Sequence, residues 1–442
     1  MAADLRDENK RLHRAGQTVG AQAAARVVSV LCLLVQTPLL LRHFGTENFG
    51  WLMAVTSFVG LSQYIDLGSA IALQQQLSVA WGTGDSERLS QVYAGGRRLL
   101  GRLAAAWLLP GLVLGLVLGP RTIPSPGGIL EIWSWVALVL SVLVGLRYSA
   151  GPRLAAAIQS GWLAAGWTAV ANLLALGAVA MGASLNAPKG FFVAAIASSQ
   201  VLPGILTELQ LRRRFEWARK PMSNDAVCAS SATIWAEGLH YAVPNLAGAA
   251  LQMSTPAIFA HWGGYTATAA YSVLLRLYGL AVQGQAMVLA PLWPAYAEAE
   301  AKGNRAWVRR TFAISLAITA ACMLAICACA GLLPWITSYW LGASSPAIGA
   351  PFAWLISLWC CVTVANQALS YLLLGLGELK RIARGVGVAH LATLGLMAAG
   401  GHYYGAIGVA AGLTCGAALL ATPQFVACTA RVLAPDKGST AQ

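Results

Sequence analysis

Long apolar runs dominate this chain of 442 residues and strongly restrict how it can fold. Hydrophobic residues make up 57% of the sequence and charged residues only 10%, whereas about a quarter of the residues of a soluble protein are charged. A helix needs about 20 apolar residues to cross a bilayer. We therefore predict an all-α polytopic membrane protein with about twelve transmembrane helices, at 19–41, 49–76, 99–119, 129–150, 160–183, 190–210, 234–260, 268–293, 310–333, 350–375, 384–400 and 403–428.

Basic residues are unevenly distributed over the segments between these spans. If the amino terminus is cytoplasmic, the cytoplasmic segments hold 24 of the 29 Lys and Arg residues, and the outer loops hold only Arg42, Arg121 and Lys189. This asymmetry follows the positive-inside rule and predicts that both termini are cytoplasmic. It also explains the net charge of +13 without any binding of nucleic acid. The polar first fourteen residues lack a signal-peptide pattern, so we expect the first span to remain uncleaved.

The chain repeats itself at about half its length. TPLLLRHFGTENFGW near residue 40 corresponds to TPAIFAHWGGYTATAAY near residue 258, which pairs Gly45 with Gly263, and further on Gly84 corresponds to Gly303. Six spans per copy give both copies one orientation, as in transporters whose two lobes are related by a parallel repeat and enclose a central cavity. The predicted parts are an N-terminal lobe at 1–211, a cytoplasmic linker at 212–232, a C-terminal lobe at 233–430 and a cytoplasmic tail at 431–442.

Several catalytic signatures are missing from the sequence. No Lys is followed by Ser or Thr, which excludes a Walker A motif, and neither HExxH nor GxSxG occurs. The predicted loops are too short to form a soluble catalytic domain. The nine cysteines contain no CxxC pair and are interpreted as small apolar residues, not as metal ligands. The sequence therefore favours a protein that is not an enzyme and that binds no metal or cofactor.

Two arginines lie inside the apolar runs, where a charge is costly and usually faces a cavity, a partner or a substrate path. Arg26 lies in the first span, and Arg276 lies about ten residues into the eighth. A guanidinium stays charged and binds phosphate through two parallel hydrogen bonds, so both arginines are candidate ligands of an anionic substrate. The alternatives are that Arg26 extends toward the inner headgroups and that Arg276 pairs with Asp66 or Glu237.

Two acids and a histidine are candidates for coupling or for ion pairs. Asp66 begins an Asp-Leu-Gly turn in the second span. It either titrates during transport, pairs with Arg26, or holds its span against neighbouring helices. Glu237 and His240 lie one helical turn apart and share a helix face. They form either a proton relay or a satisfied pair at the start of a helix.

The stretch LLLRHFGTENFG, followed by Asp66-Leu67-Gly68, resembles the amino-terminal signature of bacterial polysaccharide-repeat-unit flippases. These belong to the multidrug/oligosaccharidyl-lipid/polysaccharide superfamily, which includes the MATE transporters. AAYSVLLRLYGLAVQGQAMVLAPLWPAYAEAEAKGN in the second half is similar to the family's eighth span and the loop after it, and LPWITSYWLG is also similar. The resemblance covers most of the chain.

The resemblance implies a MATE-like fold that moves undecaprenyl-diphosphate-linked oligosaccharide from the cytoplasmic to the periplasmic leaflet of the bacterial inner membrane, for O-antigen or exopolysaccharide synthesis. Arg26 and Arg276 would hold the diphosphate. Asp66 or Glu237 would couple transport to a proton or cation gradient. A polysaccharide polymerase and a chain-length regulator are the implied partners.

Three other functions remain open. A MATE-type cation-coupled multidrug antiporter would share the fold and differ in its substrate. A major-facilitator transporter would also have two lobes of six spans, but the loop GTGDSERLSQVYAGGRR lacks that family's Gly-Asp-Arg-Gly-Arg-Arg pattern. A membrane enzyme of polysaccharide assembly is the least favoured, because no pair of acidic residues has a catalytic spacing.

Overall fold

The computed structural model describes residues 2–126, 131–158, 160–219, 222–289, 292–301 and 303–433, and these residues are helical apart from short connections. They form two compact units, one up to Ala249 and one from Ala250 onward. The helices of the first unit are α1 (Ala2–Thr56), η1 (Ser57–Gln63), α2 (Ser69–Gly82), α3 (Ser86–Ala106), α4 (Leu108–Val113), η2 (Leu114–Leu118), α5 (Gly119–Thr122), α6 (Ile132–Arg147), α7 (Ala150–Ala157), α8 (Gly161–Ser184), α9 (Lys189–Arg214), η3 (Glu216–Arg219) and the first part of α10 (Asn224–Leu289).

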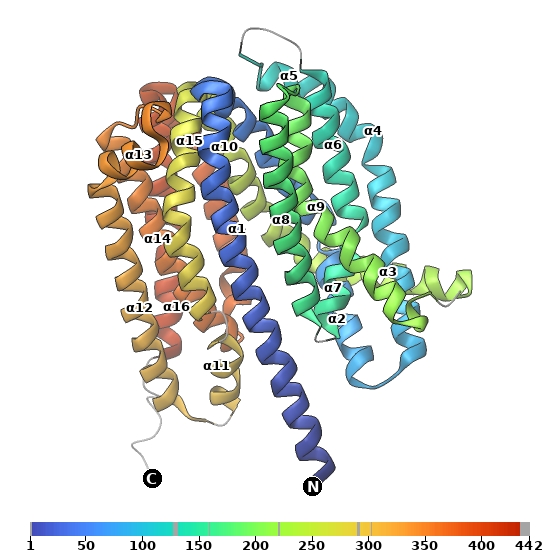
Figure 1. Ribbon diagram of the computed structural model, residues 1–442. Helices are drawn as coiled ribbons and strands as arrows, with labels where there is room; N and C mark the ends of the chain where they lie inside the picture. Colours follow the sequence, from blue (N-terminus) through green and yellow to red (C-terminus); the bar gives the residue numbers. More distant parts are fainter. Residues whose placement is uncertain are drawn as a thin grey trace. The chain divides into compact units, whose positions relative to one another are not determined.

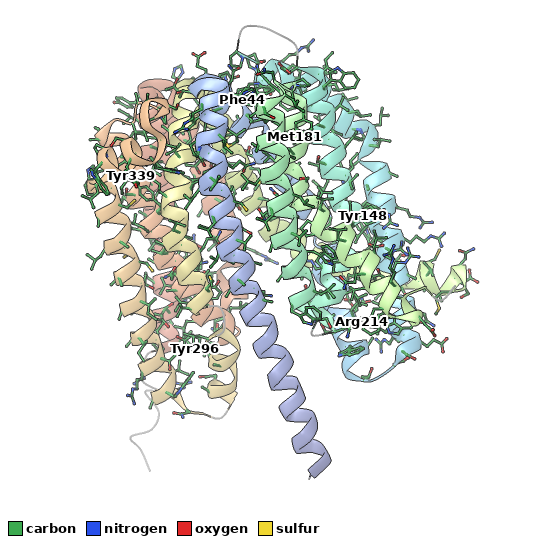
Figure 2. All side chains as sticks on the ribbon, viewed as in Figure 1. Phe44, Tyr148, Met181, Arg214, Tyr296 and Tyr339 are labelled. Atoms are coloured by element: carbon green, nitrogen blue, oxygen red, sulfur yellow. The ribbon has the colours of Figure 1, made fainter. Side chains whose placement is uncertain are left out.

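Within the first unit, α8 packs along α1 and α9, and α9 packs in turn against α6 (Figure 1). Phe44 and Met181 lie near one end of this unit, and Arg214 lies at the other end (Figure 2). A buried apolar cluster built from α2, α3, α6 and α7 fills the interior at the end that contains Arg214. The first part of α10 belongs to the same unit, because the Ser231 hydroxyl donates to the Gly95 carbonyl at 2.9 Å.

The second unit contains the rest of α10 together with α11 (Leu292–Ala301), α12 (Arg305–Gly331), α13 (Leu333–Leu341), η4 (Gly342–Ser344), α14 (Ala350–Gly375), α15 (Leu379–Cys415), η5 (Gly416–Ala421) and α16 (Thr422–Leu433). Its central element is α14, which contacts α11, α12, α15 and α16. Tyr339 on α13 and Tyr296 on α11 lie toward opposite ends of this unit (Figure 2). The division into two units does not test the predicted boundaries of the lobes and the linker, which stay a prediction.

Helix α10 turns back on itself at a single glycine. Gly264 has φ 75° and ψ 174°, a conformation outside the helical region and in the range of φ that favours glycine. The Thr268 hydroxyl donates to the Pro256 carbonyl at 3.3 Å, and the rings of Phe259 and Tyr271 are 4.7 Å apart. Twelve residues of a straight helix would separate each of these pairs by about 18 Å, so the two arms of α10 form an antiparallel hairpin.

Two other long helices break in a related way. Gly405 in α15 has φ 57° and ψ −138°, and Gly412 lies against the Leu396 carbonyl although sixteen residues separate them. Gly45 in α1 has φ 71° and ψ 173°, almost the same torsion angles as Gly264. Each break therefore lies at a glycine that has left the helical conformation.

The chain is an all-α multi-pass membrane protein. Eight of its described helical segments are long and apolar enough to cross a membrane, or nine if the bent pair Ser86–Ala106 and Leu108–Thr122 forms one span. Three of the eight, Gly20–Leu61, Leu246–Leu289 and Arg381–Leu433, have 42, 44 and 53 residues. These are at least twice the length of about 20 residues that one crossing needs, and each contains one of the glycine breaks. The predicted number of twelve spans stays a prediction.

A buried ion-pair cluster joins three helices of the first unit. The carboxylate of Glu208 on α9 is 2% exposed, and its Oε1 accepts a hydrogen bond from Arg97 Nε of α3 at 2.6 Å. Arg147 Nη1 of α6 is 4.0 Å from the same oxygen. On α7, Gly151 packs directly against the Glu208 backbone, and an added Cβ would lie 2.8 Å from its nitrogen. The acid therefore fixes the packing of α3, α6 and α9.

We expect Glu208→Gln to destabilise the first unit by about 3 kcal/mol, because removal of one partner from a buried ion pair leaves uncompensated charge in the interior. Thermal unfolding of the purified protein in detergent measures the change. Glu300→Gln is the matched control: Glu300 is 3.7 Å from Arg305, with the two side chains 39% and 46% exposed, and an exposed pair contributes less than about 1 kcal/mol. Equal effects of the two substitutions would contradict the role given to Glu208.

Candidate functional site

Arg26 lies exposed on α1, nineteen residues before the break at Gly45. One turn further along α1, the Ser29 hydroxyl accepts a hydrogen bond from Asn172 Nδ2 of α8 at 3.0 Å. The same amide nitrogen also donates to the Thr168 carbonyl at 2.8 Å. Positions i and i+3 share a helix face, so Arg26 lies on the side of α1 that makes the contact of Ser29 with Asn172.

Arg276 belongs to the second unit and lies in the second arm of α10, twelve residues after Gly264. This places it about 18 Å along the helix from the hairpin tip, inside the candidate span Leu246–Leu289. It is half-buried, and its neighbours along the helix, Leu274, Leu277 and Tyr278, are part of the buried core of this unit. The candidate span thus contains a guanidinium, and its position at mid-membrane stays a prediction.

Asp66 is part of a tight turn between η1 and α2. Its carboxylate is buried and accepts hydrogen bonds from the backbone nitrogens of Ala70 at 2.7 Å and Gly68 at 3.3 Å. Leu67 and Gly68 both have positive φ, 52° and 80°. An acidic side chain that accepts from the first amides of a helix satisfies donors that have no partner within the helix. The carboxylate therefore stabilises the break in the second predicted span.

Arg153 on α7 is the cation that acts electrostatically on Asp66. Its Nη1 also donates to Gln74 Oε1 of α2 at 3.1 Å. The hydrogen bond from Arg153 to Gln74 links α7 to α2, and Arg153 acts on Asp66 only through space. The pairing of Asp66 with Arg26 or Arg276 stays a prediction.

Glu237 is exposed on the first part of α10, and its Oε2 accepts from Gln76 Nε2 of α2 at 2.8 Å. Both side chains line a polar hollow of about 600 Å³, together with Asp85, Glu87 and Arg88 at the start of α3. This hollow and the buried carboxylate of Asp66 are both in the first unit. The side chain of His240 lies outside those that the structure describes, so its pairing with Glu237 stays a prediction.

A buried polar group in the second unit is absent from the sequence-based candidates. Gln285 of α10 is 1% exposed, and its Nε2 donates to Thr319 Oγ1 of α12 at 2.8 Å and to the Val364 carbonyl of α14 at 2.9 Å. Among the described residues its Oε1 has no hydrogen-bond partner. One turn before Thr319 along α12, Ser315 is hydrogen-bonded to the Tyr296 hydroxyl at 2.9 Å.

The described side chains show no group of three or more His, Cys, Asp or Glu residues that could hold a metal ion. The residues that sequence reasoning missed are Arg153, Glu208 and Gln285. Glu208 carried a usable signal, since it is an acid inside an apolar run just before Arg212. Gln285 carried a weaker signal: the donors and the acceptor of an amide inside an apolar run need hydrogen-bond partners, and other helices can provide them.

Comparisons with known proteins identify the fold. No family model and no curated protein sequence matches the chain. Among solved structures, an inward-facing multidrug resistance MATE family transporter of the MOP superfamily aligns with a TM-score of 0.73 at 15% identity, over 96% of this chain and all of that one. A mutant of the Vibrio cholerae MATE transporter VcmN aligns with a TM-score of 0.61 at 17% identity, over 97% and 99% of the two chains.

The lipid II flippase MurJ in an inward closed conformation also aligns, with a TM-score of 0.70 at 13% identity, over 92% of this chain and 87% of that one. Identities this low establish the fold alone. The chain therefore has the all-helical membrane fold that MATE transporters of the MOP superfamily share with the lipid II flippase MurJ.

Proposed function

We propose that this protein is a flippase that moves undecaprenyl-diphosphate-linked oligosaccharide across the bacterial inner membrane by alternating access, for the synthesis of surface polysaccharide. The observation that carries the proposal is the guanidinium of Arg276, about 18 Å from the tip of its hairpin. A fixed positive charge at that depth is costly, and binding of an anionic substrate headgroup offsets the cost. A fold shared with a lipid flippase supports the same interpretation.

Arg26 extends this proposal to the first unit. It lies nineteen residues, or about 28 Å along a helix, before the break at Gly45, which is further than Arg276 lies from the break at Gly264. In the proposed topology this places Arg26 near the cytoplasmic end of its span. We infer that Arg26 meets the diphosphate first, in the inward-open state, and that Arg276 binds it at mid-membrane.

We further propose twelve spans in two lobes of six, related by a parallel repeat. The non-helical positions support this proposal because they recur at one spacing: Gly264 lies as far along the chain from Gly45 as Gly303 lies from Gly84. The sequence pattern pairs Gly45 with Gly263, one residue too early. Asp85 and Asn304 follow the second pair, and each caps the next helix by accepting from the backbone nitrogen three residues on.

The later part of each proposed lobe shows the same spacing. Gly405 has φ 57°, and its counterpart at that spacing is Asn186 with φ 50°, a conformation that few residues other than glycine and asparagine adopt.

Counting each long helix with a glycine break as two crossings raises the nine candidate spans to twelve. An even number of crossings places both termini on one side of the membrane. The basic loops favour the cytoplasm as that side.

A MATE-type multidrug antiporter is the second candidate, because a MATE transporter shares the fold over 96% of this chain. Fixed guanidinium charges at membrane depth would repel a cationic drug, which is why we rank the flippase first. The proposed partners are a polysaccharide polymerase and a chain-length regulator, which would act on the glycan after it has crossed the membrane.

Deletion of the gene tests the proposed function directly. We expect loss of a surface polysaccharide, together with a complete lipid-linked repeat unit that accumulates on the cytoplasmic side. Mass spectrometry of extracted lipid-linked sugars and electrophoresis of surface glycan measure the two effects. Unchanged glycan with greater sensitivity to cationic drugs would instead identify an antiporter.

Arg276→Ala should reduce flipping of a lipid-linked oligosaccharide in proteoliposomes by about tenfold or more, because a hydrogen bond to a charged group contributes roughly 1.5–3 kcal/mol. Arg276→Lys should retain part of the activity, since it keeps the charge but not the two parallel hydrogen bonds. Arg26→Lys should show the same partial loss. Arg121→Ala removes an exposed cation of α5 and is the control. Normal flipping by Arg276→Ala would exclude this residue from the site.

Asp66→Asn should lower the free energy of unfolding by about 1–2 kcal/mol, as loss of a helix cap does, and should leave the pH dependence of flipping unchanged. The reason is that the carboxylate accepts two backbone hydrogen bonds that hold the turn before α2. Thermal unfolding and a pH series of the transport rate measure the two effects. A transport rate that no longer responds to pH would assign Asp66 to coupling instead of to the turn.

A further inference from the structure

A narrow apolar groove of about 290 Å³ runs along the first unit, between η1, the α4–η2–α5 stretch and α6. Along the α4–η2–α5 stretch, five of the lining residues recur at every fourth position: Trp107, Gly111, Gly115, Gly119 and Ile123. They therefore form one face of the helical stretch over about 24 Å. A small volume spread over such a length describes a channel for one extended chain, not a compartment for a compact molecule.

Glycines create the shape of this groove. At Gly115 and Gly119 an added Cβ would lie 2.6 Å from Val139 and 2.7 Å from Trp135 of α6. The missing side chains thus allow α6 to approach closely while the face beside the contact stays unfilled. The π-helical turn η2, Leu114–Leu118, lies in the same stretch, and a turn of this kind interrupts regular helix packing.

The lining is almost entirely hydrocarbon, and its only polar side-chain groups are the Thr122 hydroxyl and the indole nitrogens of Trp107 and Trp135. Its one hydroxyl, that of Thr122, donates to the carbonyls of Leu118 and Gly119 at 2.9 and 3.1 Å. A cavity lined by hydrocarbon stays dry, so water does not fill the groove. The volume is also at the lower limit of the roughly 300–1,000 Å³ that pockets for drug-sized ligands occupy. The chemistry therefore selects a single hydrocarbon chain.

The groove is open to the membrane. Leu114 and Leu118 line it and are still 50% and 45% exposed, and Val113 and Val117 beside them are 50% and 43% exposed. These residues belong to the candidate broken span Ser86–Thr122, so the medium at this surface is lipid hydrocarbon. An acyl chain can enter from the side without leaving the bilayer.

We propose that this groove is a binding site for one acyl chain of a bilayer phospholipid. The chain lies along the face from Trp107 to Ile123 and fills space that protein side chains leave empty. Its occupant is a resident lipid that supports the contact of the α4–η2–α5 stretch with α6. The site is separate from the proposed transport of a lipid-linked sugar and does not depend on it.

Photolabelling with a phospholipid that carries a diazirine on one acyl chain tests the proposal. The full-length protein is reconstituted in nanodiscs that contain a small fraction of this lipid, illuminated, digested and analysed by mass spectrometry. We expect adducts concentrated on groove residues in the peptides that cover 107–123 and 135–143, above the labelling of α12. Leu138→Trp fills the groove from α6 and should reduce this labelling by about fivefold, since a steric clash excludes the chain.

Gly111→Leu fills the groove from α4 and gives a second test if Leu138→Trp does not yield folded protein, because an added Cβ at Gly111 lies at an ordinary 3.4 Å from Val139. Leu109→Trp is the matched control, since Leu109 is 71% exposed on the same helix and does not line the groove. Labelling equal to that of α12, and unchanged in the filled variants, would overturn the proposal. Displacement of the label by added undecaprenyl phosphate would also overturn it, because the substrate's tail would then be the occupant.

Discussion

Every backbone amide and carbonyl at membrane depth must find its partner inside the protein, and this requirement determines where the chain can bend. α10 and α15 reverse at single glycines, Gly264 and Gly405, so the helical hydrogen bonds continue almost to the turn on both sides. At the interruption between η1 and α2, the carboxylate of Asp66 accepts from the backbone nitrogens of Gly68 and Ala70, at the start of the new helix. In both cases the chain leaves the helical conformation while few backbone groups lose their hydrogen-bond partners.

Ionic and polar contacts fix how the helices of the first unit are oriented against one another, because apolar packing is not directional. Glu208 lies on α9 between arginines of α3 and α6, and Arg153 of α7 donates a hydrogen bond to Gln74 of α2. Each of these contacts couples helices that are far apart in sequence. Lipid tails are as apolar as leucine, so polar contacts and close packing at small residues carry much of the specificity of helix association in membranes. Gly151, packed against the Glu208 backbone, combines both.

Local patterns in the sequence predicted the helical membrane class, since apolar runs and basic loops are read without knowledge of distant contacts. The sequence pattern paired Gly45 with Gly263, whereas the neighbouring Gly264 is the residue that leaves the helix; the two glycines look alike in sequence, and the repeat itself stays a prediction. Long-range partners were missed: Arg153 reaches Gln74 across 79 residues, and Arg97 reaches Glu208 across 111. The roles of Arg26 and Arg276 stay predictions, because the sequence shows that a charged residue lies within a span but does not show what that residue binds.

The antiparallel arms of α10 also determine which electric field acts on Arg276. The macrodipoles of two helices joined at one tip point in opposite directions, and each acts mainly within its terminal turn. Arg276 lies more than three turns from the tip at Gly264, beyond that range. The helix macrodipoles of its own hairpin therefore contribute little at Arg276. The electrostatic potential there depends on side chains and on whatever anion enters, so the affinity for such an anion is open to adjustment by single substitutions that leave the helices intact.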